Sequence, residues 1–173
     1  YDPNLVWHPM GIRYVLVMLT SLSIALFGIS EISISLPSFL GSLMNIILIY
    51  LLAKEMYDKK IAILASAFMS VFYVLIFNTT RYHTDALGVL LGLLAIYFFW
   101  KGYVNSKSRK LVWLVGIFLA LNFATRLVAV LIVGTILLYL ILTSGVKFLK
   151  NKDLWISALL GLIPLSGYLI YNI

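Results

Sequence analysis

The composition of this chain is that of an integral membrane protein. Of its 173 residues, 63% are hydrophobic and 11% are charged, and the mean hydropathy is +1.07. These values exclude a water-soluble globule of this length. The net charge of +7 comes from basic residues dispersed over loops, without an aromatic-basic motif of the kind that reads nucleic acid, so no nucleic-acid partner is expected. The absence of cysteine excludes a disulfide framework and thiolate metal sites.

Seven apolar stretches follow one another along the chain, each near the ~20 residues that cross about 30 Å of hydrocarbon. Because backbone amides cannot stay unpaired in lipid, we expect these stretches to be helices and the fold to be an all-α, polytopic transmembrane bundle. Pro37 is expected to open the second stretch, and Pro164 to kink the last one. The stretches are 10–28, 36–53, 61–77, 86–100, 111–125, 127–143 and 154–173.

The first stretch, 10–28, is ambiguous because neither of its ends carries lysine. Its length favours a membrane crossing with Tyr1 in the cytoplasm, whereas a re-entrant or interfacial helix would leave Tyr1 outside. Periodicity does not separate these alternatives. The chain begins without methionine and ends at Ile173 inside an apolar run, so we expect it to be part of a longer protein.

The basic residues predict the orientation. Ten of the thirteen lie in three short loops, and two apolar stretches separate each loop from the next. All three loops therefore fall on one side of the membrane, which the positive-inside rule makes cytoplasmic. The opposite face is then extracellular or periplasmic in a multi-pass protein of the cell membrane. The three basic loops are 54–60, 101–110 and 147–152.

The three remaining basic residues are all arginines: Arg13, Arg81 and Arg126. A guanidinium binds phosphate through a bidentate fork and keeps its charge when partly desolvated, so these residues predict an anionic, phosphate-bearing ligand. The stretch 111–125 is only about 22 Å long as a helix, which places Arg126 below the outer headgroups. There it either snorkels to the interface or lines a water-filled cavity that admits a lipid phosphate.

Two residues near Arg81, namely Asp85 and His83, could act with these arginines. Arg81 and Asp85 are four apart and share a face on a helix, which also fits an ordinary interfacial ion pair with Thr84 or Asp85 as the helix N-cap. His83 is a candidate proton carrier or metal ligand, or a polar rim residue. The sequence has no phosphate-binding glycine loop, dinucleotide fingerprint or paired-histidine zinc motif, so nucleotide-driven chemistry is not expected.

Several short motifs occur in a recognisable order. They are His8-Pro9, the run LFGISE at 26–31, Leu36-Pro37-Ser38 with Gly41, YLLAK at 50–54, TRYHTDA at 80–86, and Ala124-Thr125-Arg126. This order resembles that of the polyprenyl-phosphate-sugar glycosyltransferases, the protein O-mannosyltransferase and lipid A aminoarabinose-transferase group. These enzymes have the C-type membrane glycosyltransferase fold. The similarity runs through the chain and is clearest over 8–143, with Arg126 standing where the family often has lysine.

The resemblance implies an inverting transfer of a sugar from a polyprenyl phosphate to a hydroxyl of a protein or lipid acceptor, at the outer membrane face. It places 10–28 in the first external loop with Tyr1 outside. Residues 1–35 would then form the end of that loop, and 36–173 a transmembrane bundle of about six helices. The acidic catalytic motif of the family lies some tens of residues before the His-Pro element. Asp2 therefore does not correspond to it, and we expect the catalytic base outside this chain.

The resemblance also implies roles for the candidate site residues. We expect a donor-phosphate site, a catalytic pair in which the carboxylate orients an arginine or the acceptor, and one residue at the sugar or at a divalent metal. A metal requirement is unknown from sequence, because one ligand does not make a site. The residues expected at the donor phosphate are Arg13, Arg81 and Arg126, the catalytic pair is His83 and Asp85, and His8 is expected at the sugar or metal.

Two other classes of function fit an apolar bundle with few charges. A polytopic transporter would place ionisable groups near the bilayer midplane and show repeated halves, whereas here the charges gather toward the faces and no repeat is visible. A non-catalytic membrane assembly subunit is the second alternative. It remains open because the catalytic base is expected outside the chain.

Overall fold

The computed structural model describes residues 13–72, 84–106, 108–126 and 129–171, and every regular element within these ranges is helical. This confirms the predicted all-α class. In chain order the elements are α1 (Tyr14–Phe27), α2 (Glu31–Met56), α3 (Lys59–Ser70), α5 (Asp85–Phe99), the π-helical η2 (Trp100–Asn105), α6 (Arg109–Phe123), α7 (Ala129–Ser144), the 3-10 helix η3 (Gly145–Lys150) and α8 (Lys152–Tyr171).

Two helical segments of the described chain are long and apolar enough to cross a membrane: α2, and the continuous run Asp85–Asn105 formed by α5 and η2. The helices α1 and α7 are apolar but shorter. Large aliphatic side chains point outward from the bundle, for example Leu131, Leu142 and Leu159, which are 67%, 76% and 65% exposed. Such a surface suits lipid tails rather than water.

The start of α2 differs from the prediction. The Ser30 hydroxyl accepts a hydrogen bond from the Ser33 N–H at 3.1 Å and caps the helix, so α2 begins at Glu31. Pro37 therefore lies inside α2 instead of opening it, and its missing N–H removes the helical bond to the Ser33 carbonyl. Gly28, at φ +78°, ends α1 in a left-handed conformation that suits glycine.

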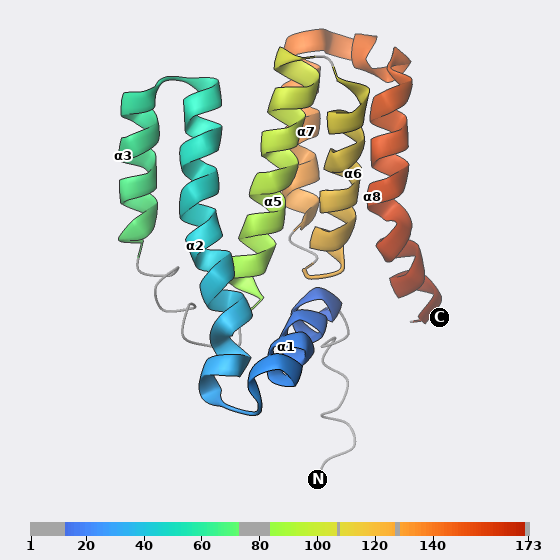
Figure 1. Cartoon of the computed structure of the whole chain (residues 1–173). Helices are drawn as coiled ribbons and strands as arrows, with labels where there is room; N and C mark the ends of the chain where they lie inside the picture. Colours follow the sequence, from blue (N-terminus) through green and yellow to red (C-terminus); the bar gives the residue numbers. More distant parts are fainter. Residues whose placement is uncertain (1–12, 73–83, 107, 127–128, 172–173) are drawn as a thin grey trace.

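The helices form a row, α3–α2–α5–α6–α8, with α7 packed against α5 and α6 (Figure 1). A small residue sets the closest approach in this row. A Cβ added at Gly116 of α6 would lie 2.4 Å from the Ser157 carbonyl oxygen of α8. The central core lies where α5, α6 and α7 meet, at Ala95, Phe99, Val115, Leu119 and Leu140.

The three basic loops lie at the same end of the bundle, which we call the lysine end (54–60, 101–110 and 147–152; Figure 1). Their shared end agrees with the prediction from sequence, in which two apolar stretches separate each basic loop from the next. The first turns of α2, α5 and α7 and the last turn of α6 lie at the opposite end, which we call the arginine end because Arg126 lies there.

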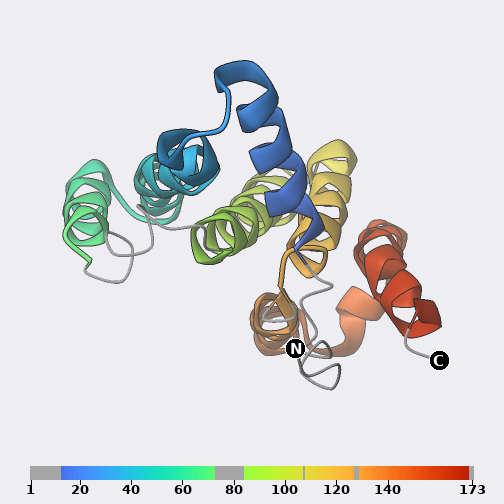
Figure 2. The ribbon, with the colours of Figure 1, turned by 90° about the horizontal axis from the view of Figure 1, so that it is seen from below.

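The helix α1 lies across the arginine end instead of running alongside the other helices (Figures 1 and 2). Its buried face, Leu16, Thr20 and Ser23, has the helical spacing of four and three residues. α1 packs mainly on α2, and in both views its first turn lies beside the C-terminal end of α6.

Candidate functional site at the arginine end

An ion pair joins two helix ends at the arginine end. Nη1 of Arg126, in the turn after α6, donates to Oδ1 of Asp85, the first residue of α5. The side chains are 41% and 32% exposed, so both charges lie at the boundary between the packed bundle and its surroundings. The Asp85 carboxylate also sits at the N-terminus of α5, where the helix dipole favours negative charge.

A tight turn fixes the backbone of Arg126. The N–H groups of Thr125 and Arg126 both donate to the Asn122 carbonyl oxygen, at 2.9 and 2.7 Å. Thr125 is fully buried, and its hydroxyl donates to the Leu121 carbonyl oxygen at 2.7 Å. The Ala124-Thr125-Arg126 motif is therefore a helix end in which the threonine anchors the turn and the arginine projects from it.

Asn122 ties this turn to α5. Only 3% of Asn122 is exposed, and its amide is satisfied when its nitrogen donates to the Gly88 carbonyl oxygen at 3.3 Å and its oxygen accepts from the Gly92 N–H at 3.2 Å. A Cβ added at Gly88 would lie 3.4 Å from Cδ of Arg126, and one at Gly92 would lie 3.2 Å from the Asn122 amide. The glycine face of α5 thus lets the end of α6 come close enough for Arg126 to meet Asp85.

A second buried asparagine holds the start of α5 against α2. Nδ2 of Asn45, a fully buried residue, donates to the Ala86 carbonyl oxygen at 2.9 Å. Its Oδ1 has no hydrogen-bond partner in the part of the chain that the structure describes. Thr84 occupies the N-cap position of α5, as one of the two predicted alternatives had it, but no hydrogen bond from its side chain caps the helix.

The structure brings together two of the predicted site residues, Asp85 and Arg126. Arg13 immediately precedes the first turn of α1, which lies beside the end of α6. Three predicted site residues, His8, Arg81 and His83, lie outside the described residues. The predicted pair between Arg81 and Asp85 therefore also lies outside them.

Sequence reasoning did not identify Asn122 or Asn45. The available signal was an amide within an otherwise apolar helix, since burying an amide in a membrane helix requires a hydrogen-bond partner. For Asn122 a second signal was the pair Gly88 and Gly92, one helical turn apart on the neighbouring segment. Within the described ranges no three His, Cys, Asp or Glu side chains are placed to hold a metal ion.

The fold and this site define a polytopic helical membrane protein with a carboxylate-paired arginine at the end opposite its lysines. The chain matches the dolichyl-phosphate-mannose-protein mannosyltransferase family over residues 8–171, and it belongs to that family. The resemblance seen in the motifs is thereby confirmed, as is the fold class, because these proteins are polytopic membrane glycosyltransferases of the C type.

A protein of Bacillus subtilis (strain 168) described as "Putative mannosyltransferase YkcB" is 28% identical to the chain over 163 residues. The match covers 91% of the chain but 22% of that relative, so the chain spans about a fifth of the relative's length. No solved structure matches the chain significantly.

Proposed function

We propose that this chain is part of an enzyme that transfers mannose from a polyprenyl phosphate to an acceptor hydroxyl, with inversion, at the outer face of the membrane. The observation that carries the proposal is the Arg126–Asp85 pair, held at the arginine end in a chain of the mannosyltransferase family. Family membership favours an enzyme over the transporter and assembly-subunit alternatives.

Arg126 is proposed to bind the donor phosphate. The Arg126 guanidinium has five N–H donors, and the one Asp85 oxygen that it contacts cannot accept hydrogen bonds from all of them. The remaining donors form the fork that suits two phosphate oxygens. The carboxylate meanwhile fixes the plane of the guanidinium, so that the donors are oriented before the ligand arrives.

The proposed reaction follows from where charge develops. The acceptor oxygen attacks the anomeric carbon while the bond from that carbon to the phosphate oxygen breaks, and its electron pair stays on the phosphate. An arginine held at this oxygen stabilises the growing negative charge. A carboxylate acting as general base takes the proton of the acceptor hydroxyl.

The other predicted residues keep proposed roles around this pair. Arg13 adds a second guanidinium through the first turn of α1. Arg81 and His83 precede Asp85 closely in sequence and are proposed to contact the phosphate and the acceptor. His8 is proposed to bind the sugar or a divalent metal, and the acceptor is a protein or a lipid.

The orientation of the site rests on the lysine end being cytoplasmic by the positive-inside rule. The arginine end then faces outward, with α1 as an interfacial helix. Met18, Leu26 and Ile29 support this placement, because they are 72%, 68% and 88% exposed at that end of the molecule, where the interface offers them acyl chains.

The proposal is tested in the full-length protein, reconstituted in vesicles with a labelled polyprenyl-phosphate mannose. Arg126→Ala is expected to lower transfer by roughly a hundredfold or more, since a donor aimed at developing charge contributes about that much. Arg126→Lys keeps the positive charge and introduces the residue that the family often has at this position, so it should recover part of the activity. The matched control is Lys59→Gln at the lysine end, and unchanged transfer by Arg126→Ala would remove this residue from the site.

A further inference from the structure

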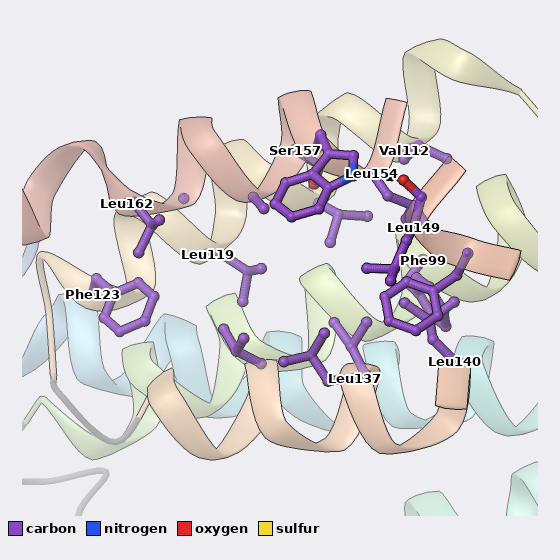
Figure 3. Close-up of a pocket in the computed structure, with 17 residues that line it drawn as sticks. Phe99, Val112, Leu119, Phe123, Leu137, Leu140, Leu149, Leu154, Ser157 and Leu162 are labelled. Carbon is purple, nitrogen blue, oxygen red and sulfur yellow. Dashed lines mark hydrogen bonds between the residues drawn. The ribbon is translucent and has the colours of Figure 1, made fainter. Parts of the chain in front are cut away.

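Two cavities adjoin at the lysine end, and the second runs from there along α6 toward the arginine end; neither is lined by Arg126 or Asp85. The first has a volume of about 430 Å³ and walls of mixed polarity, in which the polar side chains include Tyr103, Arg109, Tyr139 and Thr143, and we call it the polar cavity. The second, of about 400 Å³, is lined almost wholly by apolar side chains of α5, α6, α7 and α8 (Figure 3). Val112 lines both cavities, so a single elongated molecule can occupy them together.

Arg109 is the one basic side chain among the described residues that line the polar cavity. Among the described lining residues the one acidic side chain is Asp153, and both of its oxygens have partners. Nε of Arg109 lies 3.5 Å from Oδ2 of Asp153, and Nε1 of Trp113 donates to Oδ1 at 3.3 Å. Arg109 remains 81% exposed, which leaves most of its guanidinium accessible. The Tyr103 and Tyr139 hydroxyls in the wall can donate to phosphate or glycerol oxygens, whereas the Thr143 hydroxyl already donates to the Tyr139 carbonyl oxygen at 2.7 Å.

The rim adds more positive charge. The elements at this cavity are η2, the start of α6, the end of α7 and the start of α8, whose residues line it, and η3, whose Phe148 and Leu149 line the adjoining apolar cavity. Besides Arg109, they carry five exposed lysines: Lys101, Lys110, Lys147, Lys150 and Lys152. Basic clusters between helices at a membrane surface attract anionic lipid headgroups by about 1 kcal/mol per basic residue in the general case.

The apolar cavity has the length of an acyl chain. Phe99, Leu140 and Leu149 lie at its lysine end, and Phe123 and Leu162 lie at the other (Figure 3). Along α6 it extends from Val112 to Phe123, which is about 16 Å of helix. The cavity thus follows most of α6 (Arg109–Phe123), and this length suits a single acyl chain inserted from the lysine end.

We propose that the two cavities together bind one anionic phospholipid from the leaflet at the lysine end. Its headgroup phosphate lies against Arg109, and one acyl chain lies between α7 and α8. A zwitterionic lipid gains less from the basic rim, and a soluble anion leaves the apolar cavity unfilled. A polyprenyl phosphate bound at Arg126 would have its charged group at the opposite end. The inference is independent of the proposed function.

The test is lipid retention by the detergent-purified full-length protein, measured by native mass spectrometry after exchange with equal amounts of phosphatidylglycerol and phosphatidylcholine. The wild-type protein is expected to retain one phosphatidylglycerol in preference to phosphatidylcholine. In the combined variant Arg109→Gln, Lys147→Gln, Lys150→Gln this preference should fall by about tenfold or more.

The matched control removes three charges from the same end but away from the cavities, in the last turn of α2 and the first turn of α3: Lys54→Gln, Lys59→Gln, Lys60→Gln. It should keep the preference of the wild type. An equal loss in this control would show general surface attraction and overturn the site, as would a wild-type protein without preference.

Two further measurements test whether an acyl chain fills the apolar cavity and which lipid supplies that chain. Ala158→Phe adds bulk to the wall of the apolar cavity without changing charge, and it is expected to lower retention of both lipids. If polyprenyl phosphate displaces phosphatidylglycerol at equal concentration, the cavity belongs to the carrier and the proposal fails. Retention of phosphatidylglycerol beside bound polyprenyl phosphate supports it.

Discussion

Arg126 and Asp85 are 41 residues apart in sequence, yet the turn after α6 and the first residue of α5 bring them into an ion pair. A buried asparagine side chain holds the backbone near each of the two residues. Asn122 anchors the arginine turn on α5, and Asn45 anchors the first turn of α5 on α2. The pair is therefore a product of how three helices pack.

Asp85 is expected to position Arg126 for the phosphate. Asp85→Asn keeps the size of the side chain and its Oδ1 acceptor but removes its charge, so a weaker neutral hydrogen bond restrains the guanidinium less firmly. Transfer should fall at least about tenfold, and part of this loss should appear as a higher KM for the lipid donor. Because both side chains are about a third or more exposed, the free energy of unfolding should change by no more than ~1 kcal/mol.

Steady-state kinetics and thermal unfolding of the full-length protein separate these effects. Asp85→Glu retains the charge and should recover part of the activity. If Asp85→Asn unfolds early but turns over normally, Asp85 has only a structural role.

Asn122 is expected to stabilise the bundle and to place the arginine turn. In Asn122→Ala the polar groups at Gly88 and Gly92 lose a buried partner, at a cost of about 1–3 kcal/mol. A thermal shift assay in detergent measures this loss. The control is Ser66→Ala, a half-buried serine of α3 whose hydroxyl donates to the Ile63 carbonyl oxygen of its own helix at 2.9 Å, and an equal shift in both would contradict the assignment.

Gly116 is expected to tolerate no larger residue. The added methyl group of Gly116→Ala would meet the backbone of Ser157 at 2.4 Å and push α8 away from α6, which costs roughly 1–3 kcal/mol as overpacking. Gly134→Ala is the matched control, since nothing lies within 4 Å of a Cβ at that helical position. It should be neutral or stabilising, because alanine is favoured over glycine in a helix by up to about 1 kcal/mol. Equal stability of the two variants would contradict the packing of α6 on α8.

Orientation is testable because the chain contains no cysteine. Single variants Ile29→Cys at the arginine end and Lys150→Cys at the lysine end are placed in the full-length protein, after replacement of any cysteine elsewhere in it. A membrane-impermeant maleimide should label residue 29 in intact cells and residue 150 only after permeabilisation. The reverse pattern would put the Arg126–Asp85 pair in the cytoplasm and remove the proposed outer-face reaction.

Much of the architecture could be predicted from local sequence. The apolar stretches predicted the helices because a chain in lipid must pair its own backbone groups, whatever its neighbours are. The spacing of the lysine loops predicted that they share one end of the bundle, and the ordered motifs identified the family. Local reasoning failed at Pro37, because the cap at Ser30 starts the helix earlier than hydropathy alone indicates.

The sequence by itself determined that this is a helical membrane protein of the mannosyltransferase family, with Arg126 and Asp85 among its candidate site residues. Only the tertiary structure decided that these two residues meet, that Asn122 and Asn45 hold them, and that a polar and an apolar cavity adjoin at the lysine end. Helix formation depends on residues within a few positions of each other. Pairing and cavities depend on the distances between helices, and these are set by contacts such as that of Gly88 with Arg126, between residues far apart in the chain.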